Sequence, residues 1–385
     1  EPYVATLRFH RPDLTDVFVE RVVSLTVESA STAFVLAMSN VPVEDEQTDG
    51  PTHHFRIGTH EVNNREFARF LTDAFAQPDD ERGSYMYFDT DSGSAYIGDQ
   101  QIGQRGAGPP SGEVTFVYDA TIGRVGFDGE AFKAAAEDAW LPVVGVSWYG
   151  AAKFCNWLTV AQGMDPSERA YTEGPDADSW VPVILDPNDF ESSRVGFRLP
   201  RDDGADTASE FNEWYKAASR TGSGDFDAVY GYGRDQEPTS GDANYQPSGD
   251  PFDEVTPVGF YGAGGSRQWD DPKFGWGESP PESFDVIDTS NGYGLYDMCG
   301  NVAEWVADRY ADSYPDSPAV DPTGPSTSTG RGRVVRGGSY QSGVPWLRGA
   351  ARSAADPGER RPWVGFRCAR SDTRHAPARK PDQKH

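Results

Sequence analysis

Hydrophobic and polar positions alternate over short stretches of this chain, and long helical patterns are few. Residues 17–27 predict one or two strands, because valine or leucine occupies positions 17, 19, 22, 23, 25 and 27. A further short strand is expected at residues 55–62, and residues 142–148 have the composition of a buried strand. The chain therefore favours several small sheets.

Three stretches show helical spacing. In the first, Asn63 or Asn64 can cap a helix that carries Phe67, Phe70 and Leu71 on one face. The second has a broad apolar face over residues 151–158, and the third is expected over residues 209–218 with Ser209 as its cap. Residues 77–129 are rich in Gly, Asp and Ser and predict irregular structure with short hairpins. We predict an α+β fold with two main helices and small twisted antiparallel sheets.

No internal repeat or clear linker divides the chain. We expect residues 1–33 to form a strand segment packed on the main domain, which occupies residues 34–370. Residues 371–385 form a basic, polar tail without an apolar pattern.

The chain is strongly acidic, with 34 basic and 61 acidic residues and a net charge of −27. A field of that sign opposes binding to nucleic acid or to anionic membranes. An acidic surface suits a salty environment or cation binding, but it also follows from a GC-rich genome. No apolar run is long enough to cross a bilayer. The chain begins at Glu1 without a methionine, which favours processing and a secreted or cell-envelope location.

Five ordered segments carry a family resemblance: residues 58–67, 143–157, 197–200 with Glu213 and Trp214, 291–305, and 336–339 through 365–369. They resemble the formylglycine-generating enzyme, or sulfatase-modifying factor, family. The resemblance implies that family's C-type-lectin-like fold, with little regular secondary structure. Catalytic members carry two cysteines just after the Arg-Gly-Gly-Ser motif. Here the matching positions are Ser342 and Leu347.

This difference bears on the chemistry that the resemblance implies. Formylglycine generation uses two thiolates that hold Cu(I), and serine and leucine do not replace them. Iron is also not expected, because related sulfoxide synthases bind it through an added helical domain that this sequence lacks. We therefore expect a non-catalytic binding or structural protein without copper or iron. The alternative is an enzyme of the same fold with altered chemistry.

The segment after the Arg-Gly-Gly-Ser motif mixes aromatic, polar and charged residues, as adaptable contact surfaces do. It also resembles the variable region of diversity-generating-retroelement proteins. We expect it to contact a protein or glycan ligand, with self-association as a further option, and an ordinary structural surface is the alternative. The candidate contact residues are Tyr340, Gln341, Ser342, Trp346, Ser353, Asp356, Glu359, Arg361 and Trp363.

The resemblance further implies calcium sites and a disulfide. One site matches Asp297, Gly300, Val302 and Glu304; the other matches Asn244 and Asp250 through side chains with Tyr245 and Phe252 through carbonyls. Glu61 matches a further ligand of the family, and the alternative is that these residues only stabilise turns. The implied disulfide joins Cys155 and Cys368 and leaves Cys299 single.

Two further groups of residues are expected to be structural. Trp148, Trp157, Trp214 and Trp305 are assigned to the core. Arg336, Arg352 and Arg367 are expected to be buried donors to loop carbonyls.

Overall fold

The computed structural model describes most of the chain in separate ranges. These are residues 3–10, 18–25, 34–42, 54–76, 86–89, 92–97, 115–172, 183–184, 195–202, 212–224, 228–248, 252, 254–262, 265–268, 283–312 and 332–371. The chain forms two compact units, Glu1–Val35 and Leu36–His385. The predicted packing of residues 1–33 on the main domain stays a prediction, and residues 372–385 of the predicted tail lie outside the described residues.

The N-terminal unit is a β-hairpin. Strands β1 (Tyr3–His10) and β2 (Phe18–Leu25) pair antiparallel, with Tyr3 opposite Leu25 and His10 opposite Phe18. Val19, Val22, Val23 and Leu25 of the predicted stretch therefore belong to the second strand of this hairpin, whereas Val17 and Val27 lie outside the described residues.

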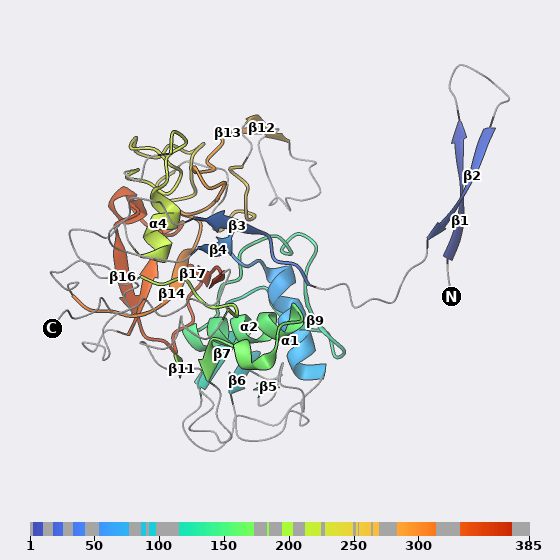
Figure 1. Cartoon of the computed structure of the whole chain (residues 1–385), viewed down its shortest axis with the longest axis horizontal. Helices are drawn as coiled ribbons and strands as arrows, with labels where there is room; N and C mark the ends of the chain where they lie inside the picture. The colour runs from blue at the N-terminus through green and yellow to red at the C-terminus, as the bar shows by residue number, and fades with distance from the viewer. Residues whose placement is uncertain are drawn as a thin grey trace, which may run out of the picture. The chain divides into compact units, whose positions relative to one another are not determined.

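The larger unit is α+β, as predicted, with short strands around a few helices (Figure 1). Its described α-helices are α1 (Asn64–Ala76), α2 (Trp148–Ala161) and the short α4 (Glu213–Ser219). The 3₁₀ helices are Pro166–Glu168 (η1) and Val344–Leu347 (η4). The strands are β3 (Met38–Val41), β4 (Phe55–Gly58), β5 (Met86–Asp89), β6 (Ser94–Ile97), β7 (Thr115–Asp119), β8 (Val125–Phe127), β9 (Phe132–Ala134), β10 (Tyr171–Thr172), β11 (Val183–Ile184), β12 (Gly265–Gln268), β13 (Ser283–Val286), β14 (Ala303–Arg309), β15 (Arg333–Arg336), β16 (Arg352–Ala355), β17 (Val364–Phe366) and β18 (Ala369–Ser371).

These strands form several small sheets. The largest has the order β16-β15-β14-β17, and three-stranded sheets have the orders β18-β4-β3 and β5-β6-β7. Among the strands that the structure describes, all pairs are antiparallel except that of β14 and β17, which run parallel. Ser371, assigned from the sequence to the tail, is the last residue of β18 and pairs with Phe55.

Two local predictions are wrong. Residues 142–148 do not form a strand: Gly145 has a φ of +70°, which interrupts the extended backbone, and only the isolated bridges Asn63–Pro142 and Tyr118–Val146 form there. Helix α4 begins at Glu213 rather than near Ser209, and Asn212 caps it by accepting from the amide of Tyr215.

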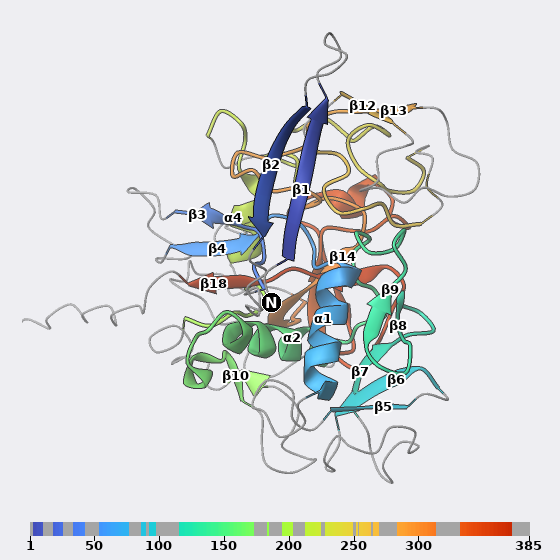
Figure 2. The ribbon, with the colours of Figure 1, turned by 90° about the vertical axis from the view of Figure 1, so that its right-hand side faces the viewer.

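The core joins the two long helices to the central sheet. Figures 1 and 2 both show α1 and α2 side by side. Phe67 and Phe70 of α1 lie against Phe154 of α2, with ring centroids 5.9 and 5.6 Å away, and Phe366 of β17 lies 5.3 Å from Phe154. All four tryptophans assigned to the core are buried. This packing fixes the sheet that carries the candidate site.

Helix α1 starts with a reciprocal pair of hydrogen bonds. The Asn63 carboxamide accepts from the Glu66 amide at 3.0 Å, and the Glu66 carboxylate accepts from the Asn63 amide at 3.0 Å. Asn63 is therefore the cap. Burial raises the pKa of Glu66 to about 7, although the bond from Asn63 opposes the shift.

This raised pKa predicts a pH dependence of folding. When the pKa of a carboxyl rises on folding, the native state binds the proton more tightly than the unfolded state does. The resulting stabilisation is complete below pH 4–5, and it is lost as the pH rises through 7. Glu66→Gln keeps an acceptor for Asn63 and should flatten the stability profile between pH 5 and 8, measured by urea unfolding. Glu130→Gln, at an exposed position, is the control. Equal profiles for Glu66→Gln and the parent chain would contradict this assignment.

Candidate functional site

A buried arginine fixes the loop that follows β15. Arg336 forms an ion pair with Asp202, and both side chains are fully buried. The same guanidinium donates to the carbonyls of Gly349 at 2.9 Å and Ala351 at 3.2 Å. Arg336 thus ties the start of the loop to its end, just before β16.

Two glycines turn the chain immediately after Arg336. Gly337 and Gly338 have φ angles of +86° and +69°, in the region that side chains disfavour. A Cβ on Gly338 would lie 2.8 Å from both the Trp346 carbonyl oxygen and the Leu347 side chain. The glycines therefore allow the loop to fold back against η4.

The loop is held by its own hydrogen bonds. The Ser342 hydroxyl accepts from the Ser339 amide at 2.9 Å, and the two serine hydroxyl oxygens lie 3.2 Å apart. The carbonyl of Ser342 accepts from the Gln246 amide at 2.9 Å, and the amide of Tyr340 donates to Asn301 at 2.8 Å. Three of the candidate contact residues, Tyr340, Gln341 and Ser342, therefore lie on a turn that hydrogen bonds hold in place.

Positions 342 and 347 face different surroundings. Leu347 is fully buried in an apolar cluster with Tyr230, Tyr232, Ala243, Tyr245 and Cys299. Ser342 instead lines a hollow of about 390 Å³. Trp346, the residue before Leu347, also lines this hollow. Its side chain is 54% exposed, which is unusual for so large an apolar residue.

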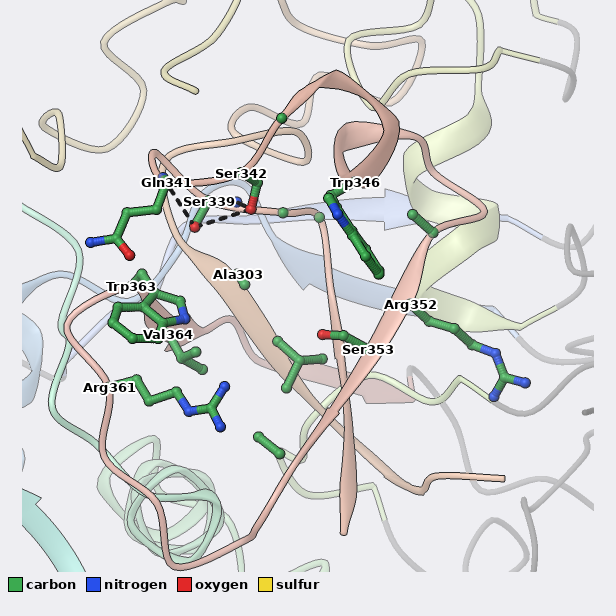
Figure 3. A pocket seen from close by; sticks show the side chains of 16 residues that line it. Ala303, Ser339, Gln341, Ser342, Trp346, Arg352, Ser353, Arg361, Trp363 and Val364 are labelled. Carbon is green, nitrogen blue, oxygen red and sulfur yellow. Dashed lines mark hydrogen bonds between the residues drawn. The ribbon is translucent and has the colours of Figure 1, made fainter. Parts of the chain in front are cut away.

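This first hollow lies over one face of the four-stranded sheet (Figure 3). Its floor consists of small or medium side chains from all four strands: Ala303, Val335, Ser353, Ala355 and Val364. Trp346 stands on one side, with Trp363 and Arg361 on the other and Gln341, Ser339 and Ser342 along the rim. The site is concave and mixes aromatic and polar groups.

A second hollow of about 410 Å³ adjoins the first. The two share Trp346, Arg352, Ser353, Ala355 and Arg361, and the second also includes Asp356 and Glu359. Eight of the nine predicted contact residues thus line one hollow or the other. Tyr340 is the exception, because its ring packs against the apolar cluster that contains Leu141 and Val302.

Arg352 and Arg361 give this region its charge, together with two acids. Arg361 forms an ion pair with Glu359 and lies over the Trp363 ring at 5.7 Å. Arg352 lies over the Tyr310 ring at 5.0 Å. Arg336 and Arg367 are buried as predicted, but Arg352 is half-buried and lines both hollows, because β16 is at an edge of the sheet.

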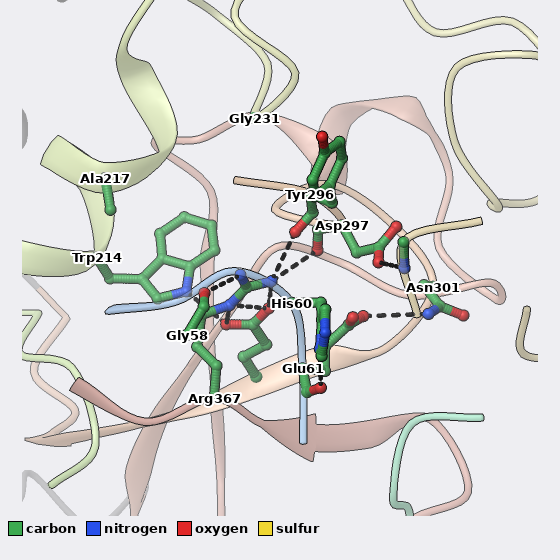
Figure 4. A network of polar contacts seen from close by, with 12 residues as sticks. Gly58, His60, Glu61, Trp214, Ala217, Gly231, Tyr296, Asp297, Asn301 and Arg367 are labelled. Atoms are coloured by element: carbon green, nitrogen blue, oxygen red, sulfur yellow. Dashed lines mark hydrogen bonds and ion pairs between the residues drawn. The ribbon is translucent and has the colours of Figure 1, made fainter. Parts of the chain in front are cut away.

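The first predicted calcium set surrounds a buried network (Figure 4). Asp297 and Asn301 have positive φ angles of 56° and 58°, and the Asp297 carboxylate accepts from the Gly259 amide at 2.5 Å. The Glu304 carboxylate already has partners of its own. Both its oxygens accept from Arg367 at 2.6–2.8 Å, and one accepts from the Trp214 indole at 2.9 Å. Gly300 and Val302 lie between these acids, so their carbonyls belong to the same turn.

Glu61 is the under-satisfied member of this network. One carboxylate oxygen accepts from the Asn301 carboxamide at 3.1 Å, whereas the other is buried without a hydrogen-bond partner. Burial raises the pKa of Glu61 well above its usual range, and the nearby carboxylates of Asp297 and Glu304 raise it further. The geometry therefore leaves one buried oxygen of Glu61 unsatisfied, close to the carboxylate of Asp297.

In the second predicted calcium set, two polar groups already have hydrogen-bond partners. The Asn244 carboxamide donates to the Glu254 carbonyl at 2.6 Å, and the Tyr245 carbonyl accepts from the Ser248 amide at 2.7 Å. Phe252 packs on Phe260, and Asp250 lies outside the described residues. Within the described ranges, no group of three or more His, Cys, Asp or Glu side chains is arranged so that it could hold a metal ion.

The three cysteines are all buried. The sulfurs of Cys155 and Cys368 lie 3.6 Å apart, within hydrogen-bonding distance, so the fold brings the predicted pair together without a disulfide between them. Burial raises the pKa of the Cys299 thiol, which favours an inert, protonated side chain. None of the three lines either hollow.

Comparisons with known proteins find relatives that match part of this chain. The chain is 47% identical over 83 residues to a formylglycine-generating enzyme of Streptomyces coelicolor, covering 20% of this chain and 26% of the relative. It is 41% identical over 100 residues to one of Thermomonospora curvata, covering 24% and 31%. These alignments span about a quarter to a third of each relative.

The structure of Treponema denticola variable protein 1 aligns with 87% of this chain and 94% of its own, at 19% identity and a TM-score of 0.46. Of the helices in the described ranges, none has the length and apolarity needed to span a membrane.

Residues 30–372 match the sulfatase-modifying factor enzyme 1-like domain. With nearly all of its larger unit inside that match, the chain belongs to the family of sulfatase-modifying factor enzyme 1-like domains.

Proposed function

We propose that this chain is a non-catalytic binding module that contacts a protein or glycan ligand through the hollowed face between Gln341 and Trp363. The observation that carries the proposal is the composition of the first hollow. An exposed Trp346 faces Trp363 across a floor of small side chains, while Ser342 and Gln341 supply polar groups on a braced turn. Such a site offers an apolar anchor and adaptable hydrogen bonding.

The same hollow lacks what copper-dependent thiol chemistry would require. Ser342 lines it with a hydroxyl already bonded to the Ser339 amide, and Leu347 points into the core. Neither side chain is a soft ligand for Cu(I). We therefore assign the face to recognition rather than to oxidation.

Binding screens test this proposal. The parent chain and Trp346→Ser are compared on a glycan array and against a displayed random-peptide library. A central exposed aromatic side chain usually contributes much of the binding energy of a contact surface. The loss of Trp346 should therefore lower the affinity for any specific ligand by at least about thirtyfold. Ligands that bind both proteins equally would place recognition elsewhere and reject the proposal.

We further propose that calcium stabilises the turn around Asp297. Glu61 and Asp297 would supply carboxylate oxygens, with carbonyls of Gly300 and Val302, and Glu304 would serve only as the partner of Arg367. Bound calcium would supply a partner for the buried Glu61 oxygen that has none. For the second set, Asn244 and Asp250, with the carbonyls of Tyr245 and Phe252, remain the proposed ligands.

A secreted or envelope location is proposed together with a Cys155–Cys368 disulfide. The two sulfurs are close and buried, and such bridges persist in oxidising compartments. Native protein, denatured without reductant and treated with a thiol reagent, should therefore show one reactive thiol, Cys299. Three reactive thiols per chain would contradict both the bridge and the location.

A further inference from the structure

Strand β16 lies at one end of the four-stranded sheet. It pairs with β15 on one side, from Arg352 opposite Arg336 to Ala355 opposite Arg333. In an antiparallel pair, alternate residues direct their amide and carbonyl groups away from the neighbour. No strand in the described part of the chain pairs with this outer edge.

The second hollow follows that edge. It is lined by every residue from 352 to 356, although successive side chains of a strand point to opposite faces. Tyr310, which contacts Arg352, lines it too, as do Trp346, Glu359 and Arg361. The hollow therefore follows the whole length of β16 and continues to the residue after it.

The side chains of β16 leave room for another backbone. Ser353, Ala354 and Ala355 are small, so a second strand can approach to the usual spacing of about 4.8 Å. Trp346 lines the same hollow and offers a large apolar surface to one side chain of the incoming segment.

The two ends of the second hollow carry side chains of opposite charge. Arg352 begins β16, and the exposed Asp356 follows its last residue. Glu359 is already paired with Arg361, so these two largely compensate each other. An acidic side chain opposite Arg352 and a basic one opposite Asp356 would complement this arrangement.

We propose that the binding face takes an extended protein segment, which adds to β16 as a fifth strand of the sheet. The segment carries an acidic residue near Arg352 and a basic residue near Asp356, with an apolar side chain against Trp346. Main-chain pairing supplies affinity, and the flanking side chains supply selectivity. This inference rests on the proposed binding function and narrows its ligand to a protein in strand conformation.

An N-methyl scan tests the pairing directly. Peptides are selected from a displayed random library on the parent chain, counter-selected on Trp346→Ser, and resynthesised with one backbone amide methylated at a time. Strand addition predicts that alternate positions lose at least about tenfold in affinity while the positions between them do not. Selected peptides without this two-residue period would overturn the inference but leave the proposed function intact.

Charge variants supply a second readout. Arg352→Glu should invert the preference for an acidic residue at its end of the peptide, whereas Arg348→Glu, at an exposed arginine that lines neither hollow, should not. Glycans that bind through Trp346 when no peptide does would overturn the inference alone. If neither library yields a Trp346-dependent ligand, the inference and the proposed function both fail.

Discussion

Replacing Arg367 by methionine is expected to destabilise the larger unit by about 3–5 kcal/mol, because the change leaves a buried carboxylate without its counter-charge. Arg367 and Glu304 are almost completely buried and bonded through two nitrogens of the guanidinium. The guanidinium also donates to the carbonyls of Gly58 and Tyr296, each at 3.0 Å. One side chain thus joins three distant segments.

Urea unfolding of the parent and variant chains measures this effect. Arg124→Met is the control, since its ion pairs with Asp138 and Glu254 are partly exposed and should each contribute less than about 1 kcal/mol. Adding Glu304→Gln to Arg367→Met should restore part of the loss, because the amide keeps an acceptor for Trp214 and carries no charge. Equal losses for Arg124→Met and Arg367→Met would contradict the assigned role.

Removing calcium is expected to lower the melting temperature by about 3–6 °C, relative to protein with free calcium at about a hundred times its dissociation constant. The physical reason is that calcium would supply a partner for the buried Glu61 oxygen that has none, with the Asp297 carboxylate as a further ligand. Differential scanning calorimetry with a chelator, followed by added Ca²⁺, measures the shift and its reversal.

Glu61→Gln separates calcium binding from general stability. The amide still accepts from Asn301, so without calcium the variant should be at least as stable as the parent chain. With calcium it should gain less than the parent. A variant that responds to calcium like the parent would remove Glu61 from the proposed site.

Much of the fold could be predicted because its signals are local. The helical spacing of Phe67 and Phe70 and the glycines of the Arg-Gly-Gly-Ser turn each act over a few residues. The choice between Asn63 and Asn64 as cap was also available locally, since only Asn63 has a glutamate three residues later. The apolar run at residues 142–148 wrongly predicted a strand, because the positive φ of Gly145 interrupts the extended backbone.

The parts that sequence reasoning missed depend on distant partners. Glu304 has the position of a metal ligand in the resemblance, yet it is engaged by Arg367, 63 residues away. Arg352 shares its residue type with Arg336 but lies on an edge strand, a property that sheet order alone determines. The floor residues Ala303 and Val364 carry no chemical signal, since they contribute by being small.

The most direct test of the central claim is an oxidation assay. The parent chain is loaded with copper and incubated with a cysteine-containing sulfatase peptide, and formylglycine is measured by mass spectrometry. Because Ser342 and Leu347 provide no thiolate pair, we expect no product above that of the copper-only control. Formylglycine formed with multiple turnovers by this chain would contradict the assignment of the hollowed face to binding.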